Sequence, residues 1–62
     1  MIDIKSGNSI IKIQKIKYNE IEYIDIRKFY RELESGEWKP TKKGITFKPE
    51  LRDEIIKALK SL

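Results

Sequence analysis

The chain has 62 residues, 39% of them charged, with a net charge of +4 and with neither cysteine nor histidine. This length allows one domain, residues 1–62, and such a short chain buries roughly 60% of the surface that its unfolded form exposes, which is marginal for a monomer. Without cysteine there is no disulfide or thiolate-bound metal, so dimerisation is the remaining common means of stabilisation and we expect a homodimer. Without histidine the commonest general base is missing, so we expect neither an enzyme nor a metal or cofactor site.

The sequence has no apolar run long enough to span a membrane, and its first residues lack the apolar centre of a signal peptide. The absence of cysteine is compatible with a reducing compartment. We therefore expect a soluble, intracellular protein without a membrane partner. Its place would be the cytoplasm and nucleoid, or the nucleus, depending on the organism.

The N-terminal third of the chain predicts strands. Residues 2–5 are a candidate first strand, and residues 10–18 alternate roughly between apolar and polar side chains with many β-branched residues. The isoleucines change parity within this second strand, so we expect a β-bulge near Gln14 or Lys15. Residues 19–20 are then predicted to form a short hairpin turn.

A further strand is predicted over residues 21–29. Ile24 and Ile26 point to one side, which is aliphatic and is expected to meet the core. The opposite side is aromatic and charged, which is unusual for a surface that only faces solvent. It carries Tyr23, Asp25, Arg27 and Phe29.

The following segment is polar over residues 32–37 and is predicted to be a connection. Residues 38–44 are predicted to be a loop or an irregular strand edge, because Pro40 removes a ladder donor and Gly44 permits a tight bend. Residues 45–47 predict a short strand.

The C-terminal segment predicts a helix with Pro49 in its first turn, acids early and lysines late, as the helix dipole favours. An apolar stripe recurs at helical spacing, and Ile56 widens it enough to suit both a core and a partner subunit. The stripe consists of Leu51, Ile55, Ala58, Leu59 and Leu62. Strands first and a helix last indicate an α+β fold.

Positive charge is concentrated in two segments that an acidic segment separates. Residues 1–19 carry four lysines and one acid, residues 20–37 carry six acids and three basic residues, and residues 38–49 carry four lysines and no acid. If the two basic segments fold side by side, they form a positive face that attracts phosphates with salt-sensitive affinity. The alternative is two solvated lysine-rich surfaces.

Aromatic residues are interleaved with these basic residues. Unpaired bases stack on aromatic rings at about 1–3 kcal/mol per base, so the combination favours single-stranded over duplex nucleic acid. The rings are Tyr18, Tyr23, Phe29, Tyr30 and Trp38. Two alternatives stay open: Phe29 and Trp38 as core residues, and Arg27 as the partner of a nearby acid, Asp25 or Glu22, instead of a phosphate.

Two segments, Y-I-D-I-R-K-F-Y at residues 23–30 and W-K-P-T-K-K-G-I-T-F at residues 38–47, resemble the transcriptional positive cofactor four family. The resemblance extends from about residue 21 to the C-terminus. It implies a four-stranded antiparallel β-sheet followed by one C-terminal α-helix, assembled as a homodimer. It also implies channels for single-stranded DNA on curved β-ribbons.

By matching positions, the resemblance implies that Arg27 contacts the DNA backbone and that Tyr30 stacks on bases. It also implies strand contacts from three lysines, Lys39, Lys42 and Lys43. The family's first hairpin supplies an aromatic residue and lysines. The candidates for these here are Lys12, Lys15, Lys17 and Tyr18.

The sequence departs from the family pattern at Thr41, where glycine is usual, and at Lys28, where the family has an acid. The serine-rich acidic region of the animal coactivators is missing, which argues against a role that rests on activator contact or phosphorylation control, and we expect the minimal DNA-binding core. Lys28 adds positive charge beside Arg27.

We expect sequence-tolerant binding of single-stranded DNA, in a coactivator-like role or in stabilising melted DNA during replication or repair. The expected partners are single-stranded DNA or RNA, a second copy of the chain, and the transcription or replication machinery. The alternatives are an RNA-binding protein that uses the same face and a protein-interaction module without nucleic acid. An enzyme remains a residual alternative, because no nucleophile–base pair or ligand cluster is present.

Overall fold

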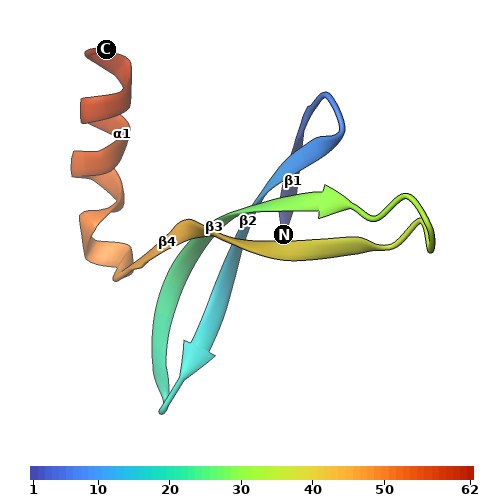
Figure 1. Ribbon diagram of the computed structural model, residues 1–62. Helices are drawn as coiled ribbons and strands as arrows, with labels where there is room; N and C mark the ends of the chain where they lie inside the picture. Colours follow the sequence, from blue (N-terminus) through green and yellow to red (C-terminus); the bar gives the residue numbers. More distant parts are fainter.

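The computed structural model describes all residues from 1 to 62 (Figure 1). Its elements in chain order are β1 (Ile2–Ser6), β2 (Ser9–Tyr18), β3 (Ile21–Arg31), β4 (Trp38–Phe47), the 3₁₀ turn η1 (Pro49–Leu51) and α1 (Arg52–Lys60). The strands form one antiparallel sheet in the order β1-β2-β3-β4. The expected α+β fold, with four antiparallel strands followed by one C-terminal helix, is confirmed.

Tight turns join the first three strands. At the β2–β3 turn, Asn19 and Glu20 both have positive φ, 49° and 65°. Positive φ at both central residues is typical of the type I′ turn, whose twist matches that of the strands it joins. The hairpin turn predicted at this position is confirmed.

The bulge predicted in β2 is wrong. β2 pairs with β3 without interruption, from Ser9 opposite Tyr30 to Tyr18 opposite Ile21. No bulge is needed because isoleucines occupy both sides of β2: those at even positions lie beside aromatic residues of β3, and Ile13 lies beside Ile26.

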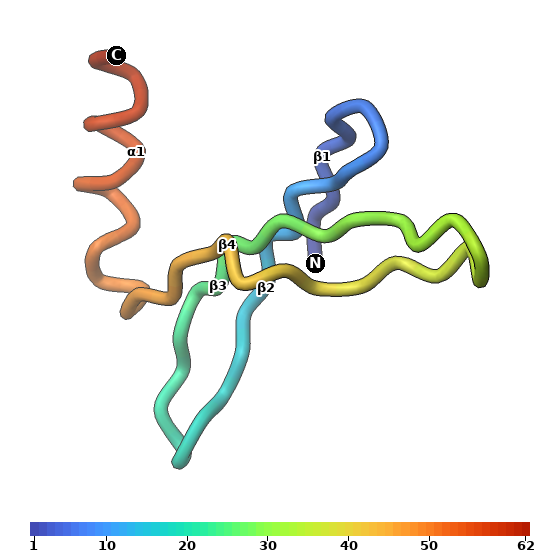
Figure 2. Tube along the Cα trace, in the orientation of Figure 1, coloured from blue at the N-terminus to red at the C-terminus, as the bar shows by residue number.

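The irregularity lies instead between β3 and β4. Arg27 is opposite Gly44, whereas Phe29 is opposite Pro40, so three residues of β4 lie opposite the single residue Lys28. Such an insertion bends a strand and increases its local twist. Figure 2 shows the result: the outer part of the β3–β4 ribbon turns away from the β2–β3 hairpin.

Of the two alternatives predicted for residues 38–44, the irregular strand edge is confirmed and the loop is wrong, because β4 begins at Trp38 and continues through this segment. β4 is an edge strand, where a proline is tolerated because one row of its backbone groups has no neighbouring strand. Pro40 is therefore paired in the register of the sheet, opposite Phe29.

The helix α1 stands beside the sheet rather than flat on it (Figure 1). It follows one 3₁₀ turn that starts at Pro49, and it has acids in its first turn and lysines in its last. Between α1 and the sheet lies an apolar groove of about 740 Å³, lined in part by Ile13, Ile24 and Phe47. The helix is too short and too polar to cross a membrane.

Candidate nucleic-acid interface

The two sides of β3 differ as the sequence predicts. Ile24 and Ile26 line the groove beside α1, and we call this side of the sheet the groove side. Side chains alternate along a strand, so Asp25 and Arg27 lie on the opposite side, which we call the open side. Lys12 lies directly beside Arg27 on the open side, because the two are cross-strand partners.

Asp25 is the one buried charged residue, with 4% of its surface exposed. Its carboxylate accepts hydrogen bonds from Thr46 Oγ1 at 2.9 Å, Gln14 Nε2 at 3.4 Å and Arg27 Nη2 at 3.3 Å. Burial by itself raises the pKa of Asp25, but these hydrogen bonds and the positive charge of Arg27 outweigh it and hold the pKa below 3.8. Asp25 is therefore an ionised group at neutral pH that holds Arg27.

Arg27 is fixed at both terminal nitrogens. Nη2 contacts Asp25, and Nη1 donates to the backbone carbonyl of Thr41 at 3.1 Å. The predicted alternative of an ion pair with Asp25 is thus realised. A guanidinium has five N–H donors, and these two contacts leave the others for a ligand.

Gly44 makes room for this arrangement. A Cβ atom at Gly44 would lie 3.0 Å from Arg27 Cζ and 2.8 Å from the backbone oxygen of Ile26. Any larger residue would push the guanidinium or the strand away, so glycine allows Arg27 to lie across β4.

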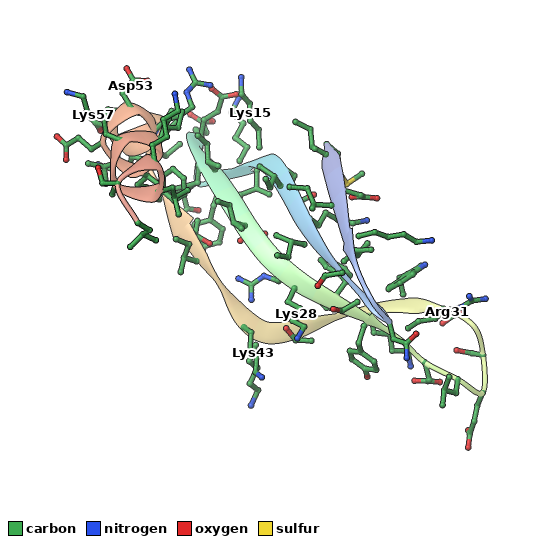
Figure 3. The ribbon with its side chains drawn as sticks, turned by 90° about the horizontal axis from the view of Figure 1, so that it is seen from above. Lys15, Lys28, Arg31, Lys43, Asp53 and Lys57 are labelled. Carbon is green, nitrogen blue, oxygen red and sulfur yellow. The ribbon has the colours of Figure 1, made fainter.

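Four basic residues surround the register shift: Arg27, Lys28, Lys42 and Lys43. We call this group the basic bend. The three lysines are exposed, and none of the three ion pairs of the structure involves them. Figure 3 shows Lys28 and Lys43 together on the middle of the β3–β4 ribbon. Unpaired cations at such short spacing attract an anion, and a chain of phosphates supplies anions at regular intervals.

Tyr30 and Lys39 lie beyond the bend, as cross-strand partners on the outer part of the ribbon. Lys39 Nζ is 2.7 Å from Glu32 Oε2. Tyr30 is exposed and, by strand alternation, projects from the other side of β3 than Arg27. The register shift lies between the two positions, and both residues belong to the β3–β4 ribbon.

The predicted residues of β2 are spread over both sides of the sheet. Lys12 lies beside Arg27, with its Nζ 4.9 Å from the centre of the Phe29 ring. Lys15 lines the groove near α1 (Figure 3), and Lys17 projects from the same side. Tyr18, at the end of the hairpin, is 67% exposed.

Sequence reasoning missed the polar residues that support Arg27. The exception is Asp25, which was predicted as a candidate partner of Arg27 because the two residues lie two positions apart on one strand. The contributions of Thr41 and Thr46 require the register between β3 and β4, which no local pattern reveals. Of the five rings, Tyr18, Tyr30 and Trp38 are exposed, whereas Tyr23 and Phe29 are half-buried.

Residues 5–58 match the family described as transcriptional coactivator p15 (PC4). The RNA polymerase II transcriptional coactivator SUB1 of Saccharomyces cerevisiae (strain ATCC 204508 / S288c) is 44% identical over 41 residues, which cover 66% of this chain and 14% of that relative. No solved structure matches the chain. Because the family match covers nearly the whole sheet and most of the helix, the chain belongs to the transcriptional coactivator p15 (PC4) family.

Proposed function

We propose that this protein is a non-enzymatic, coactivator-like protein that binds single-stranded DNA with little sequence preference. The observation that carries the proposal is the basic bend, where a fixed arginine and three exposed lysines without an acidic partner flank the register shift between β3 and β4. Phosphates would occupy the bend, and the affinity would fall as salt concentration rises.

The exposed rings favour single strands over duplex DNA. Tyr18, the last residue of β2, pairs with Ile21 at the start of β3, and Tyr30 lies near the end of β3, so two exposed rings flank the basic bend along the chain. By strand alternation they project from opposite sides of the sheet. Bases stack on such rings only when they are unpaired, because a duplex hides their faces. Stacking does not depend on the identity of the base, so it gives affinity without sequence preference.

We further propose that the functional unit is a homodimer in which a second copy covers the groove beside α1. Ile10 and Ile24 are the buried hydrophobic residues of the single chain. Leu59, which lines the groove, is 61% exposed. A single chain this small is only marginally stable by itself, and a second copy is the one partner always present at equal concentration.

Binding of single strands would stabilise melted DNA, because a ligand that binds only the open form lowers its free energy relative to the closed form. The relative in Saccharomyces cerevisiae is named for RNA polymerase II. We propose that transcription is the setting for this protein too, in the compartment that holds the DNA, with the transcription machinery as its partner.

Fluorescence anisotropy with labelled oligo-dT, a duplex of the same length and oligo-U tests the proposal. We expect oligo-dT to bind at least about tenfold more tightly than the duplex, a difference of about 1.4 kcal/mol. We expect the affinity to fall linearly on a logarithmic scale of salt concentration. Equal binding of the duplex, tighter binding of oligo-U, or no binding at low salt would contradict the proposal.

A further inference from the structure

Thr41 lies in the part of β4 that is out of register with β3. Lys28 has no partner residue on β4 in the register of the sheet. Instead, the Lys28 carbonyl accepts a hydrogen bond from Thr41 Oγ1 at 2.7 Å. Thr41 Oγ1 in turn accepts a hydrogen bond from the N–H of Lys43 at 3.1 Å. The hydroxyl therefore connects β3 to β4 where the backbone ladder is interrupted.

The backbone carbonyl of Thr41 also contributes to the bend, because it accepts the hydrogen bond from Arg27 Nη1. The position of this carbonyl depends on the path of β4 through the bend. That path is held on one side by the Thr41 hydroxyl and on the other by Gly44, which lies directly against Arg27. Thr41 thus contacts the Lys28 carbonyl of β3, the Arg27 guanidinium and the Lys43 amide.

We propose that Thr41 is a positioning residue whose hydroxyl holds the basic bend in the shape that receives phosphate. This inference rests on the proposed binding of single-stranded DNA. Without the hydroxyl, the carbonyl of Lys28 and the amide of Lys43 lose their partner, and β4 is free to move relative to β3. Arg27 then loses a fixed acceptor, and Lys43 loses its place beside Lys28.

Substitutions at Thr41 can separate the effect of the hydroxyl from the effect of side-chain volume. Valine has nearly the volume of threonine but no hydroxyl, whereas serine keeps the hydroxyl and lacks the methyl group. Thr41→Val therefore removes the two side-chain hydrogen bonds, and Thr41→Ser retains them. Thr41→Ala removes the hydroxyl without adding a branched carbon, and it serves if the valine variant does not fold.

The test measures oligo-dT affinity, its salt dependence and the amide hydrogen exchange of Lys43 in the full chain. We expect Thr41→Val and Thr41→Ala to bind about threefold to tenfold more weakly, as loss of one net hydrogen bond predicts. We expect their salt slope to fall by about 0.7, the value of one phosphate contact. The Lys43 amide should exchange faster in both variants, and Thr41→Ser should restore affinity, slope and protection.

Two results would overturn the inference: equal affinity of the valine and serine variants, or weaker binding without faster exchange at Lys43. The proposed function fails separately, if the unsubstituted protein does not bind oligo-dT. If the protein does not bind oligo-dT, faster exchange of the Lys43 amide in Thr41→Val would still show that the hydroxyl holds β4 against β3. Unchanged exchange would contradict that structural role as well.

Discussion

Asp25 shows how a single buried carboxylate can organise a basic surface. It accepts hydrogen bonds from three neighbouring side chains, one of which is Arg27. The contact orients the guanidinium, and it does so in a half-buried position where screening by solvent is weaker than at an open surface. An arginine fixed in advance loses less conformational entropy when a phosphate binds.

The lowered pKa of Asp25 predicts a pH dependence of stability. Because the pKa is lower in the folded state than the ordinary value of 3.8, the unfolded state binds the proton more tightly. The stabilisation is therefore complete above pH 3.8 and is lost as the pH falls through the folded pKa. Urea unfolding between neutral and acidic pH should show this loss.

Asp25→Asn is the control for that titration. It should be less stable than the unsubstituted protein by about 1–3 kcal/mol at neutral pH, because Arg27 loses its charged partner. The difference between the two proteins should shrink as the pH falls below 3.8. A constant difference across the whole pH range would show that the charge of Asp25 contributes nothing.

Lys42 and Lys43 provide the corresponding test for phosphate contacts. Lys42→Ala combined with Lys43→Ala should weaken oligo-dT binding and lower the salt slope by about 0.7 for each lost contact. Lys57→Ala with Lys60→Ala is the matched control, because it removes the same charge from α1, where Lys57 points away from the sheet (Figure 3). If both double variants change the slope equally, only net charge matters and the basic bend is not the site.

At the scale of elements, the register shift between β3 and β4 decides where the basic residues lie. Three residues of β4 opposite one residue of β3 bend the ribbon, and the lysines of the bend project from this point. Gly44 stands at the inner end of the shift, in contact with Arg27 and the backbone of Ile26.

Gly44→Ala should destabilise the protein by about 1–3 kcal/mol, because its Cβ would overlap atoms that are already in contact. Oligo-dT binding should weaken with it. In an Arg27→Ala background the cost should be smaller, since the contact with Arg27 Cζ is gone while those with the Ile26 oxygen and Arg27 Cα remain. Thermal unfolding measures both effects, and an unchanged melting temperature for Gly44→Ala would contradict the close packing.

Local patterns predicted the elements that depend on local causes. The terminal helix, the turn at Asn19 and the alternation of β3 all follow from spacing and backbone preference. Local patterns could not decide between a loop and an irregular strand edge for residues 38–44, because tolerance of Pro40 depends on its position at the sheet edge. The bulge was placed in the wrong strand, because a register shift is a property of two strands and cannot be read from one.

At the scale of the whole molecule, the single chain leaves an apolar groove uncovered. Its groove is lined mainly by hydrophobic residues from both the sheet and α1, and it is open to solvent. The groove has a volume of about 740 Å³, and nine of its twelve lining residues are hydrophobic. The apolar stripe of the helix was predicted from spacing, but the orientation of α1 beside the sheet was not.

Leu59→Glu tests whether a second copy fills the groove. In a monomer this substitution should be harmless, because Leu59 is already 61% exposed. In a homodimer it should shift the mass in solution from two chains to one, because it places a charge in an apolar interface. Leu33→Glu, at a position that is 93% exposed on the β3–β4 turn, is the control and should leave the mass unchanged. A mass of one chain for the unsubstituted protein would contradict the dimer.

An NMR titration of the isotope-labelled protein with oligo-dT tests directly whether the basic bend binds single-stranded DNA. We expect the largest shift changes on the basic bend, on the adjacent Gly44, and on the rings of Tyr18 and Tyr30. The signals of Lys57 and Lys60 on α1 should change little. Changes concentrated on α1, or none at all at low salt, would contradict the claim that the bend receives the DNA.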